Sequence, residues 1–129
     1  MKYISTRGGM SAAPYSAILL EGLATDGGLV VPETVPQVTP EQIESWRGLD
    51  YPQLAAEILS LYATDIPRED LDAMCRAAYS TDKFVSEQIV PVTPLEGASP
   101  IGQISLVGLS EGPTLAFKDM AMQFLGEAL

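Results

Sequence analysis

The sequence of 129 residues contains no histidine and a single cysteine, Cys75. Without histidine there is no Ser-His-Asp triad, and a catalytic zinc site, whose ligands are mostly histidine and cysteine, is nearly excluded. A lone cysteine cannot form an internal disulfide. This composition fits a protein of a reducing compartment.

Basic residues are also scarce, since 7 lysines and arginines stand against 17 aspartates and glutamates, for a formal net charge of −10. A protein this acidic has no electrostatic reason to bind nucleic acid or an anionic lipid surface. No run approaches the roughly 18 apolar residues of a membrane span. Residues 1–7 lack the apolar region of a signal peptide. We therefore expect a cytoplasmic protein without nucleic-acid or membrane partners.

Hydrophobic residues make up 47% of the chain and charged residues 19%, which favours a folded core over disorder. The length suits one domain or part of one. The pattern predicts a short strand at residues 2–6, a helix at 15–24 and a second short strand at 29–31. The Asp-Gly-Gly sequence at 26–28 is a turn signal, which we interpret as serving hairpin geometry alone.

Helical signals dominate the middle of the chain. Residues 39–42 have the form of a capping box with proline at the first helical position. Apolar residues recur at helical spacing over 54–62 and again over 71–78. We interpret both helices as packing elements. Cys75 lies on the second apolar stripe, so we predict that it fills the core and is not a nucleophile.

The last part of the chain changes character. Residues 89–94 are extended and interrupted by proline, and residues 101–109 are apolar and β-branched, which predicts a strand. A turn follows at 110–113. A helix is expected from about Ala116, with Thr114 as its cap.

These elements predict an α+β fold in this chain, helix-rich with a small antiparallel sheet. We expect residues 1–95 to form a helix-rich N-terminal domain and residues 96–129 to begin an α/β domain that is mostly absent. Met1 has the character of a native start, whereas Leu129 lies inside a helical pattern with no stop signal. A cut there exposes apolar surface, which favours self-association of the chain.

Lys118 breaks the pattern of the last helix. A cation is unfavourable in a first turn because the helix N-terminus carries partial positive charge. Apolar residues precede it at 115–117, and Met120 and Met122 follow it. Both effects would lower the pKa of a buried lysine and favour the neutral amine, which attacks an aldehyde to form a Schiff base. From spacing alone, however, Lys118 and Asp119 are more typical of a solvated charged pair.

Three blocks of sequence carry a resemblance to a known family. Residues 112–119 read Gly-Pro-Thr-Leu-Ala-Phe-Lys-Asp, residues 3–8 read Tyr-Ile-Ser-Thr-Arg-Gly, and residues 26–32 read Asp-Gly-Gly-Leu-Val-Val-Pro. Their sequence and order resemble threonine synthases, pyridoxal-phosphate enzymes of the tryptophan-synthase-β-like fold. The resemblance extends over essentially the whole chain. Glu111 departs from the family pattern, because many relatives have histidine or asparagine at this position. The make-up of the wall near the cofactor or substrate is therefore in doubt.

The resemblance implies the N-terminal part of a fold-type II pyridoxal-phosphate lyase that converts O-phospho-L-homoserine and water to L-threonine and phosphate. It makes Lys118 the Schiff-base lysine, which also moves protons at the α and β carbons of the substrate. Phe117 is implied to lie near the cofactor ring, although core packing explains it equally well. Such enzymes hold the cofactor phosphate on a later glycine- and serine/threonine-rich loop. No such loop follows Lys118, so we expect this fragment to be inactive alone.

Residues 5–8 suggest a second site. The hydroxyls of Ser5 and Thr6, the guanidinium of Arg7 and the flexible backbone of Gly8 suit a phosphate oxyanion. We therefore consider Ser5, Thr6 and Arg7 as candidates for binding the substrate phosphate. An ordinary surface arginine at the end of a strand is the alternative.

Two rival functions stay open. The chain could come from another pyridoxal-phosphate lyase or synthase of the same fold type, although the blocks at 5–8 and 26–29 argue against it because they are not general to that fold. It could also be a truncated, non-catalytic homologue that acts as a binding or regulatory module. A stop codon after residue 129 in the gene would favour the second rival.

Overall fold

The computed structural model describes residues 1–97 and 102–129 of the chain. It contains both helices and short strands, as expected for a mixed α+β segment. Their order is β1 (Tyr3–Ser5), α1 (Tyr15–Glu21), β2 (Val30–Pro32), α2 (Pro40–Ser45), α3 (Tyr51–Tyr62), α4 (Arg68–Ala78), β3 (Val92–Pro94), β4 (Ser105–Val107) and α5 (Asp119–Ala128).

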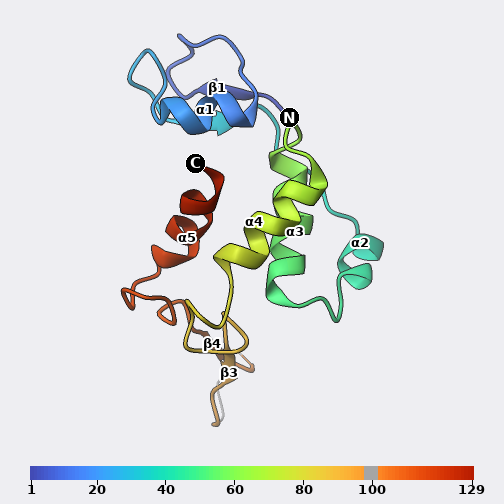
Figure 1. The fold of residues 1–129 in the computed structure, drawn as a ribbon. Coiled ribbons are helices and arrows are strands. Elements are labelled where there is room, and N and C mark those ends of the chain that lie inside the picture. Colours follow the sequence, from blue (N-terminus) through green and yellow to red (C-terminus); the bar gives the residue numbers. More distant parts are fainter. Residues whose placement is uncertain (98–101) are drawn as a thin grey trace.

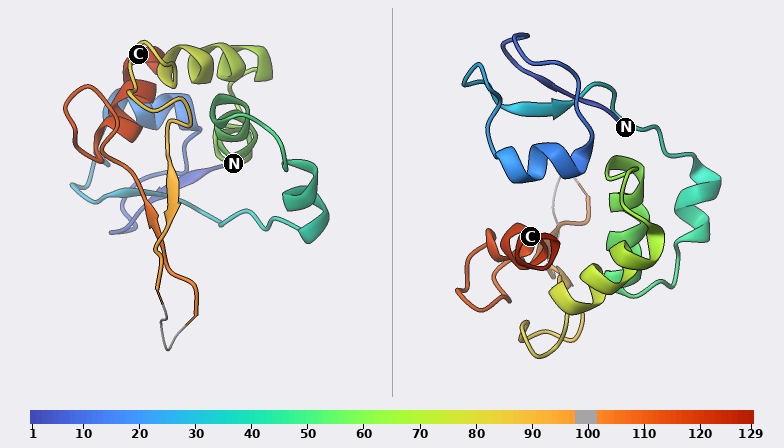
Figure 2. Two further views of the ribbon diagram at one scale, coloured as in Figure 1. Left: turned by 90° about the horizontal axis from the view of Figure 1, so that it is seen from below. Right: turned by 45° about the horizontal axis from the view of Figure 1, so that its top comes forward.

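The described strands form two separate two-stranded sheets, both antiparallel. In the first, Ile4 of β1 pairs with Val31 of β2, and α1 lies beside this pair (Figure 1). In the second, Thr93 of β3 pairs with Leu106 of β4, and the two strands project from the helices (Figure 2). The predicted α+β class with small antiparallel sheets is therefore confirmed. The strand predicted at 101–109 is shorter than expected, and its first residue lies outside the described residues.

Helix α1 ends three residues earlier than the sequence pattern suggested. Gly22 adopts a left-handed backbone conformation with φ of 75°. Its N–H donates to the carbonyl oxygen of Ile18 at 3.0 Å. Glycine accepts this conformation without steric cost, so it ends the helix there and not at Ala24.

Side-chain capping boxes start helices α2 and α3. Thr39 accepts a hydrogen bond from the backbone N–H of Gln42 at 3.3 Å, and Gln42 Oε1 accepts one from the Thr39 N–H at 3.0 Å. Asp50 and Gln53 form the same reciprocal pair at 2.8 and 3.0 Å. The box at Thr39 was predicted from its sequence, and the structure confirms it. Each box satisfies two N–H groups that a helix start otherwise leaves unpaired.

The core lies between α3, α4, α5 and the segment after α4. Cys75 is fully buried there, as predicted for a packing residue, and burial raises the pKa of its thiol to about 11. The Tyr79 hydroxyl donates to the carbonyl oxygen of Met120 at 2.9 Å and so joins α4 to α5, which lie side by side in Figure 1. The main buried residues are Ala56, Leu71, Cys75, Phe84, Ile89 and Phe124.

Ion pairs connect the same helices on the outside. Arg68 at the start of α4 donates to Glu57 of α3 at 2.6 Å and to Asp72 at 2.9 Å. Lys83 pairs with Glu127 of α5 at 2.6 Å. These side chains are partly exposed, so each pair stabilises the fold by only about 0–1 kcal/mol. Packing of apolar side chains therefore carries most of the contact between these helices.

Candidate functional site

Lys118 lies at the entrance of α5, not inside its first turn. It occupies the N-cap position, with φ of −62° and ψ of −25°. Its carbonyl oxygen accepts the backbone N–H groups of Ala121 at 3.1 Å and Met122 at 3.0 Å. The helix expected from about Ala116 therefore begins three residues later, and Lys118 is the last residue of the turn that leads into it.

Asp119 explains why the helix starts late. Its carboxylate accepts two hydrogen bonds from Thr114, one from the backbone N–H at 2.8 Å and one from the hydroxyl at 2.9 Å. These bonds close a turn over residues 114–119, so Thr114 is held by Asp119 and is not itself the cap of α5. Burial is the largest single influence and raises the pKa of Asp119, but the hydrogen bonds from Thr114 and from the backbone of Ala116 together lower it more, and the net pKa lies below its ordinary value.

The side chains of Lys118 and Asp119 diverge. Asp119 is buried, with 3% of its surface exposed, whereas Lys118 is exposed. The solvated pair that the spacing suggested is therefore not formed. Within residues 1–97 and 102–129, no carboxylate lies within ion-pairing distance of the Lys118 amine. The burial on which the sequence argument for a neutral amine depended is also not present in this chain.

Two backbone features shape the turn before Lys118. A side chain at Gly112 would bring its Cβ to 2.7 Å from Asp119 Oδ2, which is too close for any residue but glycine. Leu115 has a φ of 57°, a left-handed conformation that leucine rarely adopts. Strain of this kind persists only where surrounding contacts enforce it, and it gathers at functional sites. The turn is therefore a candidate site on backbone grounds alone.

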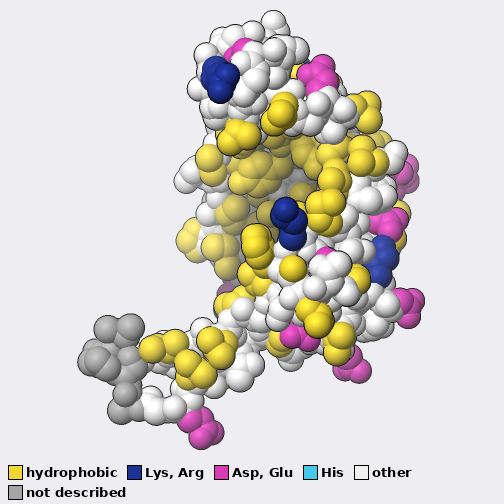
Figure 3. Space-filling view, turned by 90° about the vertical axis from the view of Figure 1, so that its left-hand side faces the viewer, with side chains coloured by type: hydrophobic (Ala, Val, Ile, Leu, Met, Phe, Trp, Pro, Cys, Tyr) yellow, Lys and Arg dark blue, Asp and Glu magenta, His cyan; other side chains and the backbone are white. Residues whose placement is uncertain are grey.

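Exposed apolar side chains surround the lysine in sequence. Leu115 is 69% exposed, Phe117 71% and Met122 49%. Phe117 therefore does not pack in the core of this chain. Its position near a cofactor ring stays a prediction. The side of the molecule on which α5 lies is hollowed, and basic side-chain atoms lie among the hydrophobic ones around the hollow (Figure 3).

A second polar cluster joins the loop after β1 to the turn before β2. The Asp26 carboxylate accepts hydrogen bonds from the Ser5 hydroxyl at 2.7 Å, the Gly9 N–H at 2.7 Å and the Gly28 N–H at 2.9 Å. The hydrogen bond from Ser5 is the largest of the causes that hold the pKa of Asp26 below its ordinary value. Sequence reasoning missed this role of Asp26. The only signal was an acid directly before two glycines.

The structure brings Ser5, Thr6 and Arg7 together on this loop with different exposure. Ser5 is buried, and its hydroxyl donates to Asp26 and accepts the backbone N–H of Arg7 at 3.0 Å. Thr6 is exposed, and its Oγ1 accepts the N–H of Leu29 at 3.0 Å. Arg7 is exposed, and its Nη1 donates to the backbone oxygen of Asp26 at 3.2 Å. Thr6 and Arg7 are therefore the accessible members of the three.

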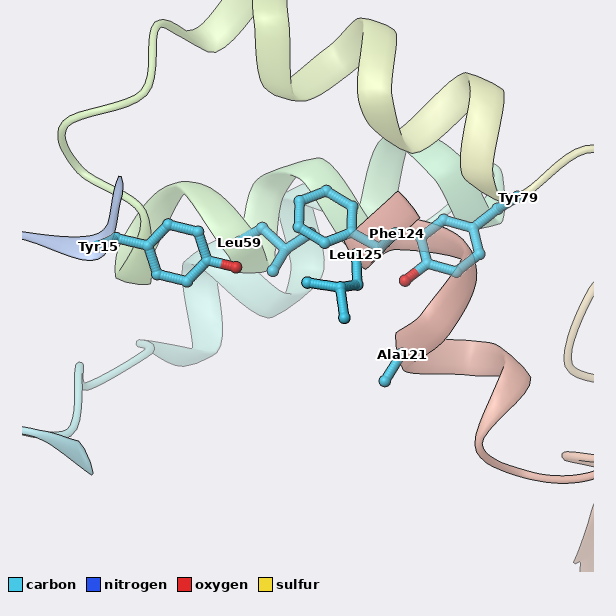
Figure 4. Close-up of a pocket in the computed structure, with 6 residues that line it drawn as sticks. All are labelled: Tyr15, Leu59, Tyr79, Ala121, Phe124 and Leu125. Carbon is cyan, nitrogen blue, oxygen red and sulfur yellow. The ribbon is translucent and has the colours of Figure 1, made fainter. Parts of the chain in front are cut away.

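An apolar groove lies where α1, α3, α4 and α5 approach one another. Figure 4 shows the residues that line it, which are Tyr15, Leu59, Tyr79, Ala121, Phe124 and Leu125. The Tyr79 hydroxyl is already bonded to Met120. The groove offers little to orient a polar substrate, so we do not regard it as a catalytic site.

Two kinds of site are absent from the part of the chain that the structure describes. No group of three or more acidic, cysteine or histidine side chains lies close enough together to hold a metal ion there. None of its helices is both long enough and apolar enough to span a membrane.

Two small antiparallel sheets and a helical core place the chain in the α+β class, with a lysine presented at a strained turn as its most distinctive site. Comparison with known proteins then gives the family. A family model described as "Threonine synthase N terminus" matches residues 2–79. The chain therefore belongs to the threonine synthase family, in its N-terminal region.

Individual relatives agree over almost the whole chain. It is 52% identical to the threonine synthase of Corynebacterium glutamicum, over 98% of this chain and 26% of that protein. It is 46% identical to the threonine synthase of Methylobacillus glycogenes, over 98% of this chain and 27% of that protein. The chain thus spans about a quarter of the length of these curated relatives.

Solved structures show the same correspondence. The threonine synthase of Brucella melitensis, described as bound to PLP, matches with a TM-score of 0.86 and 40% identity, over 98% of this chain and 26% of that one. The yeast threonine synthase matches with a TM-score of 0.85 and 34% identity, over 98% of this chain and 25% of that one. The fold of this chain is therefore that of the N-terminal region of these enzymes.

Proposed function

We propose that this chain forms the N-terminal part of a pyridoxal-phosphate-dependent threonine synthase. The reaction is the conversion of O-phospho-L-homoserine and water to L-threonine and phosphate. The observation that carries the proposal is Lys118, an accessible amine at a strained glycine-containing turn, in a chain of this family. The division into residues 1–95 and 96–129 stays a prediction, and the hydrogen bond from Tyr79 to Met120 crosses that boundary.

The residues around Lys118 fit pyridoxal phosphate in their chemistry. A primary amine without an ion-pair partner among the described residues is free to react with the aldehyde of the cofactor. Phe117 and Leu115 expose apolar surface suited to the flat ring. When bound, the cofactor supplies an electron sink for charge that develops on the substrate. Gly112 keeps the backbone close to Asp119 and so fixes where α5, and with it Lys118, begins.

In this proposal Lys118 has two tasks. Its amine would hold the cofactor, and it would carry protons at the α and β carbons of the substrate. The bond between the γ carbon and the phosphate oxygen breaks, phosphate leaves, and water adds at the β carbon. The γ carbon gains a proton and becomes the methyl group of threonine. Asp119 serves the turn and, being bonded to Thr114, is not available as a second base.

Arg7 and Thr6 are proposed to bind the substrate phosphate, with Ser5 supporting the loop. A guanidinium forms short, charge-assisted hydrogen bonds with phosphate oxygens. Such a local cation is needed because the chain as a whole carries a formal charge of −10, which repels an anionic substrate.

The experiment is a chimera in which this chain replaces the matching segment of the Corynebacterium glutamicum enzyme. We expect the chimera to release phosphate from O-phospho-L-homoserine, and Lys118→Ala to abolish the activity. Arg76→Ala, on an exposed position of α4, is the matched control that leaves the rate unchanged. The isolated 129-residue chain is expected to be inactive. A chimera that folds and binds cofactor but does not turn over would favour the non-catalytic binding module instead.

A further inference from the structure

The side chain of Arg7 lies across the turn formed by residues 26–28. Its Nη1 donates to the backbone oxygen of Asp26 at 3.2 Å. A Cβ on Gly27 would lie 3.3 Å from the same Nη1. A Cβ on Gly28 would collide first with Ser5 Oγ, and it would also lie 3.0 Å from Asp26 Oδ1 and 3.2 Å from Arg7 Cγ. Two consecutive glycines therefore leave space for the arginine side chain and, at Gly28, for the hydrogen bond between Ser5 and Asp26. Gly27 also has a φ of 74°, which favours glycine there on backbone grounds.

The charge of Arg7 is not neutralised by the neighbouring acid. The carboxylate oxygens of Asp26 accept hydrogen bonds from Ser5, Gly9 and Gly28, and Arg7 is bound to the backbone oxygen instead. In the part of the chain that the structure describes, Arg7 has no carboxylate within ion-pairing distance. An exposed guanidinium, fixed by a neutral acceptor and left with its full charge, suits an incoming anion.

The same carboxylate fixes the loop that carries Arg7. Ser5 and Gly9 stand on either side of Arg7 in the chain, and Asp26 binds both. The Ser5 hydroxyl that donates to Asp26 also accepts the backbone N–H of Arg7. Asp26 therefore constrains the backbone at both ends of the loop and, through Ser5, at Arg7 itself.

We propose that Asp26, with Gly27 and Gly28, is a positioning device that holds Arg7 ready for the phosphate group of the substrate. This inference rests on the proposed function of Arg7 and deepens it. Asp26 does not touch the substrate; it acts through the loop. Preorganising the guanidinium lowers the entropy lost when the phosphate binds, so its removal weakens binding of the anion.

The first test compares Asp26→Asn with Asp65→Asn in the chimeric enzyme. Asp65 is a matched control because its carboxylate also accepts two backbone N–H groups, those of Tyr15 at 3.1 Å and Ser16 at 3.0 Å. Both variants should lower the melting temperature of the protein. Only Asp26→Asn should raise the KM for O-phospho-L-homoserine and the inhibition constant of inorganic phosphate together, each by roughly tenfold, the factor that corresponds to about 1.4 kcal/mol of binding energy.

A second pair of variants moves Arg7 without touching a carboxylate. Gly27→Ala adds a Cβ against Arg7 Nη1, whereas Gly22→Ala adds one where nothing lies within 4 Å. The two glycines have nearly equal φ values of 74° and 75°, so both substitutions place an alanine at a positive φ. We expect Gly27→Ala to weaken phosphate binding and Gly22→Ala to leave it unchanged.

The 129-residue chain itself gives a readout independent of activity. Titration with inorganic phosphate should shift the NMR signals of the Gly8 and Gly9 amides. Arg7→Ala should remove the shift, and Asp26→Asn should weaken it. If Arg7→Ala leaves both the titration and KM unchanged, the phosphate role of Arg7 fails and the positioning role fails with it. If Arg7→Ala weakens binding but Asp26→Asn and Gly27→Ala match their controls, the phosphate role stands and the positioning role is overturned.

Discussion

The Asp119 carboxylate accepts both the backbone N–H and the hydroxyl of Thr114, at 2.8 and 2.9 Å, and so closes the turn that presents Lys118. Asp119, the residue next to Lys118, is therefore buried, whereas Lys118 is exposed. This arrangement separates the two charges that the sequence places side by side. It fixes the position of Lys118 at the start of α5, and no carboxylate among the described residues pairs with its amine.

Replacing Gly112 tests the close approach behind the lysine. Gly112→Ala should lower the free energy of unfolding by about 1–3 kcal/mol, because the added Cβ collides with Asp119. Gly126→Ala is the matched control, since it lies within α5 and nothing would touch its Cβ. There alanine should stabilise the helix by up to about 1 kcal/mol. Urea unfolding of both variants measures the difference, and equal effects would contradict the collision.

Leu115 tests whether strain in the turn serves the site. Leu115→Gly should leave the isolated chain as stable or slightly more so, because glycine accepts the φ of 57° and the leucine side chain is exposed. In the chimeric enzyme the same change should lower turnover, because apolar surface beside Lys118 is lost. Thermal melting and a phosphate-release assay give the two readouts. A variant with reduced stability and unchanged turnover would show that the leucine only supports the fold.

Acid should weaken the fold through its bonded aspartates. The pKa values of Asp26, Asp65 and Asp119 lie below their ordinary value, mainly because their carboxylates accept hydrogen bonds. Their contribution is therefore present above the unfolded value of about 4 and is lost as pH falls through the lower folded values. Urea midpoints should be similar at pH 7 and 5 and lower at pH 3. Replacing the three aspartates by asparagine should flatten this dependence.

Cys75 should be chemically inert in the folded chain. Its thiol is fully buried, and burial raises its pKa to about 11, so little thiolate exists near neutral pH. A thiol reagent at pH 8 should react far more slowly with the folded chain than with free cysteine. Denaturing urea should restore the normal rate. Fast reaction without denaturant would mean that α4 opens readily.

Self-association of the isolated chain is a prediction from its exposed apolar surface. Phe117 and Leu115 are among the most exposed large apolar residues, at 71% and 69%. Sedimentation velocity should show a mass that rises with concentration. The double substitution Leu115→Ser and Phe117→Ser should reduce it, whereas Val85→Ser, at 81% exposure on another part of the chain, serves as the control. A monomer at all concentrations would refute the prediction.

Much of the fold was predictable because its signals are local. The capping box at Thr39 is complete within four residues, and the apolar stripes of α3 and α4 follow from helical spacing. The burial of Cys75 followed from its place on such a stripe. Lys118 was identified because the residues around it form a string typical of one family, which the comparisons confirmed at the level of the family.

The start of α5 was predicted wrongly because periodicity does not reveal a side chain that competes with the helix. Residues 116–118 fit the helical pattern of the sequence. The Asp119 carboxylate, however, accepts the Thr114 N–H and so closes a turn over residues 114–119 ahead of the helix. The end of α1 was missed for a similar reason, since the conformation of Gly22 outweighs the apolar residues after it. In both cases one specific interaction decided a boundary that average propensity left open.

The sequence by itself determined the class of the fold, the main helices, the burial of Cys75 and the family that Lys118 indicates, because each depends on residues close together in the chain. Only the tertiary structure decided that Asp26 binds the loop of Ser5 to Gly9, and that Asp65 binds the start of α1, 49 residues away at Ser16. Those contacts form only after the chain has folded back on itself. No sequence pattern predicts which distant donors a carboxylate will bind, whereas the apolar pattern of a helix repeats every few residues.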